Sequence, residues 1–230
     1  FWDNLSPLCY TQQVEEQFAN WIWITERADF NMAVKSLRKA YTKDPKRILE
    51  LARKYLYDPQ SPYRNESLYG HLCEVAGDEL AETAHDCLLN SVGTKTADFE
   101  IEDQRGRIFN LYSVEADYIL LVFSNPMCTA CKEIVETLTT EQFILDAIST
   151  GKLTVVDVYP DEELEEWRKT VKNYPNTWKI GFDPSFNLQN SKLYNIRAIP
   201  SLYLLDKDKT VILKDATFER IMRYLETVSR

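Results

Sequence analysis

The sequence contains few histidines and few cysteines, and this scarcity excludes several classes of protein. Two histidines and five cysteines occur among 230 residues. Disulfide-stapled scaffolds are short and dense in cysteine, so a chain of this length is not one of them. After residue 92 the sequence has no histidine, and its cysteines there are Cys128 and Cys131. A zinc site would need further ligands, so zinc is a poor explanation for this pair.

The chain also has fewer positively charged residues than negatively charged ones. The chain has 27 Lys and Arg against 36 Asp and Glu, which gives a formal net charge of -9. It contains no basic run with interleaved aromatic residues. We therefore expect neither nucleic acid nor an anionic membrane surface among its partners, because both attract positive charge.

Long apolar runs are missing as well. The longest uncharged run, residues 118–131, includes Ser124, Asn125 and Pro126. It is shorter than the ~20 apolar residues of a spanning helix, so it predicts a core strand and a turn, and no membrane span is expected. The chain begins at Phe1 and its first methionine is Met32. We interpret this as a missing natural start, which removal of a signal segment would explain.

Two domains are expected from the hydrophobic content of 44% and from a change of pattern near residue 92. Within residues 1–92 the apolar positions recur at helical spacing, which predicts an all-α domain of about five short helices. Asp44 and Asn65 are expected to cap two of them. Within residues 93–230 strands and helices alternate, which predicts a sheet with helices packed on its faces.

The run at residues 118–123 reads as a buried strand, and helical spacing begins after Pro126. Cys128 and Cys131 therefore fall at a helix start. Unpaired N–H groups and the helix dipole stabilise a thiolate there, and thiol-disulfide exchange requires one. The other elements are expected at residues 99–101, 108–112, 153–158, 161–173, 185–194, 202–205, 211–213 and 218–228.

This order of elements, with a CxxC at a helix start and an Ile-Pro before a hairpin and a final helix, resembles the α/β thioredoxin-like fold. GTKTADFEIEDQRGRIFNLYSVEADYILLVFSNPMCTAC and KLYNIRAIPSLYLLDKDKTVI resemble the TlpA-like and ResA-like thiol-disulfide oxidoreductases of bacterial envelopes. Residues 1–92, with FWDNL and KYLYDPQSPYRNESLY, resemble a helical domain of unknown function that precedes such modules in Gram-negative anaerobes.

The resemblance implies roles for residues around the cysteine pair. Cys128 would be the attacking thiolate, Cys131 the buried resolving thiol, and Pro200 a cis proline facing both sulfurs. The backbone of Ile199 would pair with an extended substrate. Further substrate contacts are implied for three neighbours of the cysteines, which depart from the usual family residues: Met127, Thr129 and Ala130.

A proton relay is the least defined part of this expectation. The position at which thioredoxins carry a buried acid is occupied here by Val122, which cannot relay protons. ResA-like proteins use a glutamate after the next strand, and the matching place offers Asp161, with Glu162 as second choice. We therefore expect the relay at one of these two carboxylates, with solvent as the alternative.

The function that the resemblance implies is reduction of protein disulfides in the periplasm or cell envelope of a Gram-negative bacterium. It needs no cofactor beyond the redox-active disulfide. Its expected partners are a disulfide-containing protein substrate and an upstream thiol electron donor, and its oligomeric state stays open. The alternative is a non-catalytic peptide- or protein-binding module in which the two cysteines form a structural disulfide.

Peroxide reduction is a further activity of this fold, found in peroxiredoxins that share a Pro-x-x-x-Thr-x-x-Cys run. Counting back from Cys128 gives Asn125 and Leu121, and counting back from Cys131 gives Cys128 and Ser124. Neither cysteine has the required Thr and Pro. We therefore expect no peroxidase.

The helical half contains His71-Leu72-Cys73 and His85-Asp86-Cys87, which invite a metal site or a second disulfide. In a helical hairpin Cys73 and Cys87 would be displaced by about six residues, or ~9 Å along the axis. This exceeds disulfide reach, and the same mismatch disfavours a metal site. We expect packing or surface residues, and for Cys9 a free thiol.

Overall fold

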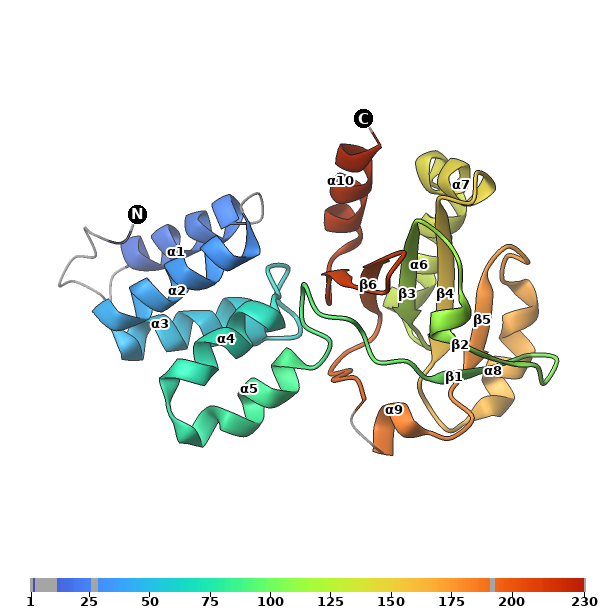
Figure 1. The fold of residues 1–230 in the computed structure, drawn as a ribbon, viewed down its shortest axis with the longest axis horizontal. Coiled ribbons are helices and arrows are strands. Elements are labelled where there is room, and N and C mark those ends of the chain that lie inside the picture. The colour runs from blue at the N-terminus through green and yellow to red at the C-terminus, as the bar shows by residue number, and fades with distance from the viewer. Residues whose placement is uncertain (1, 3–11, 26–28, 191–192, 230) are drawn as a thin grey trace. The chain divides into compact units, whose positions relative to one another are not determined.

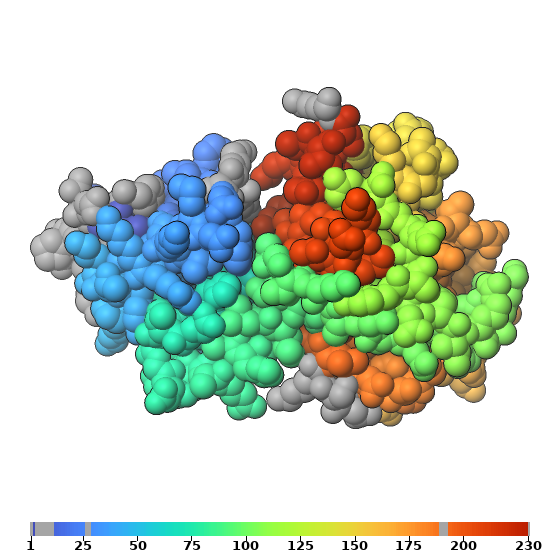
Figure 2. Space-filling model, in the orientation of Figure 1, coloured from blue at the N-terminus to red at the C-terminus, as the bar shows by residue number. Residues whose placement is uncertain are grey.

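The computed structural model describes residues 2, 12–25, 29–190 and 193–229, and so does not describe Cys9. The chain divides into two compact units, Phe1–Leu89 and Asn90–Arg230. The boundary predicted from the sequence, after residue 92, lies close to the observed one. Figure 1 shows the elements of each unit, and Figure 2 gives the same view in space-filling form. In the part of the chain that the structure describes, no helix combines the length and apolar character needed to cross a membrane.

The first unit is all-helical, as predicted. The side chain of Asp44 accepts a hydrogen bond from the backbone N–H of Arg47, and that of Asn65 accepts one from Leu68, so both expected caps are confirmed. The elements are α1 (Gln12–Thr25), α2 (Phe30–Lys43), α3 (Pro45–Ala52), a π-helical turn (Arg53–Tyr57), α4 (Glu66–Ala76), a 3-10 turn (Asp78–Leu80) and α5 (Ala81–Leu88).

An aromatic core holds these helices together. Trp2 and Trp21 are buried, with ring centroids 5.7 Å apart. Both donate their indole N–H to the hydroxyl oxygen of Ser36, at 2.9 Å and 3.0 Å. The buried indoles thus keep their hydrogen bonds, which removes the cost of burying an unpaired donor.

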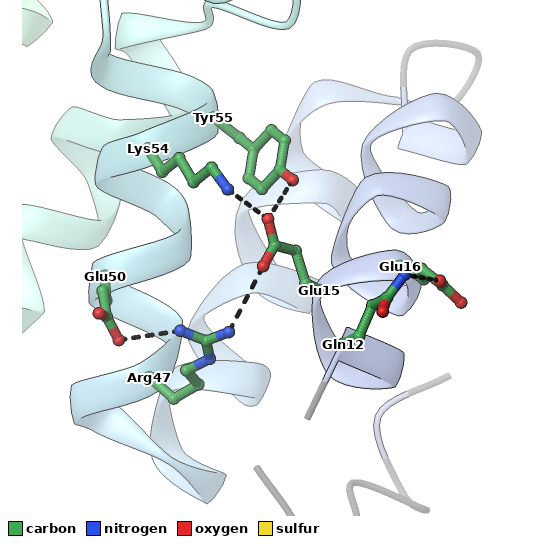
Figure 3. A network of polar contacts seen from close by, with 7 residues as sticks. All are labelled: Gln12, Glu15, Glu16, Arg47, Glu50, Lys54 and Tyr55. Carbon is green, nitrogen blue, oxygen red and sulfur yellow. Dashed lines mark hydrogen bonds and ion pairs between the residues drawn. The ribbon is translucent and has the colours of Figure 1, made fainter. Parts of the chain in front are cut away.

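A polar network joins α1 to α3 and to the turn that follows it (Figure 3). Glu15 accepts a hydrogen bond from the hydroxyl of Tyr55 at 2.6 Å, and it pairs with Lys54 and, at 3.7 Å, with Arg47. Arg47 also pairs with Glu50 at 3.0 Å. The hydrogen bond from Lys54, followed by that from Tyr55, lowers the pKa of Glu15. The network is a link between helices at the surface of this unit.

The second unit is built on a mixed sheet of seven strands in the order β2-β1-β5-β4-β3-β6-β7, flanked by helices as predicted (Figure 1). Strands β3, β4 and β5 are parallel, and the remaining pairs are antiparallel. The strands are β1 (Glu100–Asp103), β2 (Ile108–Asn110), β3 (Tyr118–Phe123), β4 (Leu153–Tyr159), β5 (Lys179–Phe182), β6 (Ser201–Asp206) and β7 (Val211–Leu213). The α-helices are α6 (Thr129–Thr140), α7 (Gln142–Ser149), α8 (Leu164–Thr170), α9 (Asn187–Asn190) and α10 (Phe218–Val228).

Strand β3 lies inside this sheet, between β4 and β6, and is covered on both faces. Leu121 and Phe123 pack in one apolar cluster. Leu120 and Val122 pack in another, together with residues of α6, α7 and α10. Burial on both faces explains why the strand reads as an uninterrupted apolar run.

Four element predictions differ from the structure. Strand β5 and helix α7 were not predicted, the acidic helix begins at Leu164 instead of 161, and the helix expected at 185–194 is the short α9. Strand β5 has little apolar signal and forms by pairing with β4 and β1. Gly181 permits this pairing, because an added Cβ would lie 2.5 Å from the backbone oxygen of Glu102.

Candidate active site

The loop after β3 places Cys128 at the start of α6. The side-chain oxygen of Asn125 accepts the backbone N–H of Met127 at 2.8 Å, and its carbonyl accepts that of Cys128 at 2.9 Å. Cys128 is the N-cap of α6, and its sulfur accepts the backbone N–H of Cys131 at 3.3 Å. An N–H aimed at the sulfur stabilises negative charge there, as the helix start led us to expect.

The loop before β6 lies against the same sulfur. The peptide bond between Ile199 and Pro200 is cis, the isomer that the resemblance implied. The Cys128 thiol donates toward the carbonyl oxygen of Ile199 at 3.8 Å. Met127 is 63% exposed beside it. The backbone of Ile199 therefore lies against the Cys128 sulfur, and the exposed Met127 is the residue directly before Cys128.

The two cysteines have opposite environments. Cys128 is partly exposed, and its neighbours Thr129 and Ala130 are exposed, whereas Cys131 is fully buried. Burial is the largest of the effects that raise the pKa of Cys131 to about 12. A backbone hydrogen bond from Asn125 lowers this pKa, whereas the nearby Cys128 and the charge of Asp157 raise it further. Cys131 is therefore a neutral thiol that needs a proton acceptor before it can react.

Asp157 on β4 is the buried acid of the site. Only 2% of it is exposed, and the hydroxyl of Ser124 donates to its two carboxylate oxygens at 2.9 Å and 3.0 Å. Burial raises the pKa of Asp157 to about 7, against the opposing hydrogen bond from Ser124. Because Asp157 is the register partner of Val122 in the parallel β3–β4 pair, the two side chains share one face of the sheet. The acid thus stands one strand away from the position that Val122 occupies.

The two carboxylates predicted as proton relays lie elsewhere. Asp161 accepts a hydrogen bond from the side-chain amide of Asn125 at 2.6 Å, so it anchors the loop that carries Cys128. Glu162 is exposed. The sequence prediction missed Asp157, although one signal was present. A single acidic residue stands inside the otherwise apolar strand LTVVDVY, where burial of an unpaired charge is costly.

The cysteines of the helical unit have a different setting. Cys73 and Cys87 are both buried, and burial raises the pKa of Cys73 to about 11. Among the residues that the structure describes, no three His, Cys, Asp or Glu side chains lie so that they could hold a metal ion. Both cysteines lie among the apolar residues of the helical core, so they are packing residues of that unit.

Comparison with known proteins covers both units. The family model described as AhpC/TSA family matches residues 92–214, and a domain of unknown function, DUF5106, matches residues 1–86. A thioredoxin-like protein from Bacteroides caccae is 36% identical, with a TM-score of 0.83 over 99% of this chain and 90% of that chain. A search of curated proteins gives no match.

Two further solved structures match the second unit. The C-terminal domain of an uncharacterized protein from Bacteroides fragilis is 43% identical, with a TM-score of 0.58, over 60% of this chain and 98% of that chain. The thioredoxin domain of a thiol-disulfide oxidoreductase from Bacteroides vulgatus is 18% identical, with a TM-score of 0.53, over 61% of this chain and 99% of that chain. The similarity to the Bacteroides vulgatus domain, at 18% identity, shows a shared fold and nothing more specific.

Proposed function

The chain belongs to the AhpC/TSA family, and on this basis we propose that it is a thiol-disulfide oxidoreductase that reduces protein disulfides through Cys128 and Cys131. One observation carries the proposal. The sulfur of Cys128 caps α6, faces the carbonyl of Ile199 and lies in front of the buried Cys131. A partly exposed nucleophile with a buried thiol behind it is the arrangement that two-step disulfide exchange requires.

The reaction proceeds by two exchanges. The Cys128 thiolate attacks one sulfur of a substrate disulfide, which forms a mixed disulfide and releases the first substrate thiolate. Cys131 then gives its proton to the Asp157 carboxylate and attacks the Cys128 sulfur. This releases the second substrate thiolate and leaves a Cys128–Cys131 disulfide, which an upstream thiol donor reduces. The two electrons pass from the cysteine pair to the substrate, and no bound cofactor is needed.

Asp157 is suited to the proton transfer by its charge state. A carboxyl group whose pKa burial raises to about 7 is present in both protonation states near neutral pH. General bases act best when their pKa lies near the working pH. We assign the relay to Asp157 in place of Asp161 or Glu162, because Asp157 is the acid whose charge acts on Cys131.

The surface around Cys128 supports an extended protein segment as substrate. The Ile199 backbone lies beside the sulfur, and Met127 is exposed on the same loop as Cys128. Strand addition to such a backbone recognises any extended peptide, while the side chains of Met127, Thr129 and Ala130 adjust the fit. The cell envelope of a Gram-negative bacterium is the proposed location, in keeping with similar proteins from Bacteroides.

A disulfide-reductase assay tests the proposal. Wild-type protein is expected to accelerate reduction of a disulfide-bonded reporter protein by dithiothreitol, and Cys128→Ser to lose roughly 100-fold or more of this rate, because a serine hydroxyl cannot replace the thiolate. Cys73→Ala, which changes a cysteine of the helical unit, serves as the control and is expected to keep the wild-type rate. A wild-type rate no higher than that of dithiothreitol alone contradicts the proposal.

A further inference from the structure

Asn125 stands at the start of the loop that carries Cys128, and both polar groups of its side-chain amide are hydrogen-bonded. The amide nitrogen donates to a carboxylate oxygen of Asp161 at 2.6 Å, and the amide oxygen accepts the backbone N–H of Met127 at 2.8 Å. The backbone carbonyl of Asn125 also accepts the N–H of Cys128 at 2.9 Å. One residue therefore ties the loop of the nucleophile to the loop that follows β4.

The carboxylate of Asp161 fixes which way the Asn125 amide points. An ionised carboxylate has acceptors only, so Asp161 bonds to the nitrogen of this amide and not to its oxygen. With the nitrogen held toward Asp161, the oxygen is left for the N–H of Met127. Pro126 lies between Asn125 and Met127 with a fixed φ and no N–H of its own, which restricts the turn further.

The turn determines where the sulfur of Cys128 lies. Cys128 enters α6 as its N-cap, with an extended backbone (φ -80°, ψ 126°), and its sulfur accepts the N–H of Cys131 at 3.3 Å. The carbonyl oxygen of Ile199 lies 3.8 Å from the same sulfur. A shift of the turn moves the sulfur relative to both groups, and a weaker hydrogen bond from the Cys131 N–H leaves less thiolate.

We propose that Asn125 and Asp161 are positioning residues that hold the Cys128 sulfur against the N–H of Cys131 and so keep it reactive. The inference rests on the proposed function, because it concerns the nucleophile of that reaction. It gives Asp161 an effect opposite to that of its charge. A negative charge near a thiolate disfavours the thiolate, whereas the bond from Asn125 to Asp161 favours it through the geometry of the turn.

Two substitutions at Asp161 separate the hydrogen bond from the charge. Asp161→Asn removes the charge and keeps an oxygen that can accept from the Asn125 amide, whereas Asp161→Ala removes both. The rate at which iodoacetamide alkylates Cys128 at pH 7 reports the thiolate, since the thiolate is the nucleophile. Asp161→Ala is expected to lower this rate roughly fivefold, and Asp161→Asn to keep it within about twofold of wild type. A carboxylate that acted by charge alone would make both variants faster.

Asn125→Ala tests whether the two residues act through their shared bond. It is expected to lower the alkylation rate roughly fivefold, as Asp161→Ala does. In the double variant Asn125→Ala/Asp161→Ala the second substitution has no bond left to break, so the rate is expected to fall no further than in Asn125→Ala. Asp161→Ala thus slows the wild-type protein and does not slow Asn125→Ala. Two residues that acted independently would multiply their effects.

The experiment uses the reduced full chain, and mass spectrometry of peptides assigns the label to Cys128. Amide hydrogen exchange of Met127 reports the turn itself and is expected to be faster in Asn125→Ala and Asp161→Ala, and unchanged in Asp161→Asn. Glu162→Ala, which changes the exposed residue next to Asp161, is the control and is expected to alkylate at the wild-type rate.

Three results overturn the inference: alkylation of Asp161→Ala at or above the wild-type rate, slowing of Asp161→Asn as large as that of Asp161→Ala, or multiplied effects in the double variant. If Asn125→Ala does not fold, the two Asp161 variants decide it. Alkylation needs no turnover, so it stays readable in a protein that reduces no disulfide.

Discussion

The Cys131→Ser variant is expected to stop halfway through the reaction and to accumulate disulfide-linked complexes with its substrates. Cys128 keeps its backbone hydrogen bond in this variant, because the N–H at position 131 belongs to the main chain. The serine hydroxyl cannot attack the mixed disulfide, so the complex persists. We expect roughly tenfold or more linked substrate than with wild type, measured on non-reducing gels after thiol alkylation, and released by dithiothreitol.

The matched variants make the assignment of the two cysteines specific. Cys128→Ser and the double variant Cys128→Ser/Cys131→Ser are expected to trap no substrate, because the buried Cys131 cannot meet an incoming disulfide. Equal trapping by Cys128→Ser and Cys131→Ser would mean that the attacking and resolving roles have been assigned wrongly. Native cell-envelope extract is the best source of substrate, since the trapped proteins identify the partners as well.

Asp157→Asn is expected to stabilise the protein at high pH. The folded protein holds a proton on Asp157 up to about pH 7, whereas the ordinary value of an aspartate is 3.8. Between these values the unfolded chain has lost that proton, so wild-type stability falls as pH rises. The difference between the folded and the unfolded pKa of Asp157 corresponds to up to about 4 kcal/mol in the free energy of unfolding. Urea unfolding of both proteins at pH 4 and pH 8 measures it.

The expected pattern is a stability gap between Asp157→Asn and wild type that is small at pH 4 and fully developed at pH 8. Asp161→Asn is the matched control, since Asp161 bonds to Asn125 near the same loop. It is expected to show the wild-type pH dependence. A gap that does not change between pH 4 and pH 8 would show that Asp157 is not buried in a protonated form.

The same variant tests the catalytic role of the acid. Without a proton acceptor, resolution of the mixed disulfide by Cys131 is expected to slow roughly 100-fold at pH 7 in Asp157→Asn. Asp161→Asn and Glu162→Gln are expected to resolve it at the wild-type rate. Rapid quenching with acid, followed by mass spectrometry of the linked complex, measures this step. A slow Asp161→Asn beside a normal Asp157→Asn would return the relay to the residue that sequence reasoning favoured.

The parts of the fold and of the site that were predictable are local in sequence. Cys128 sits where apolar spacing changes from strand to helix, and Asp44 and Asn65 stand directly before their helices. Each of these signals is contained in a few neighbouring residues. The loop at Ile199 and Pro200 was placed through resemblance, and its contact with Cys128 follows from the fold.

The parts that were missed depend on pairing between distant segments. Asp157 lies behind the thiols because β4 pairs with β3 in a register that sets it beside Val122, and no local pattern states that register. Strand β5 itself is held between β4 and β1, with Gly181 allowing the close approach.

The reduction potential of the Cys128–Cys131 pair tests the central claim most directly, because it separates a redox catalyst from a binding module with a permanent disulfide. The protein is equilibrated in glutathione and dithiothreitol buffers of known potential, and the fraction of reduced pair is read from the mass added by alkylation. The proposed function predicts a midpoint between roughly -270 and -120 mV. A midpoint far below about -300 mV would mark a structural disulfide and contradict it.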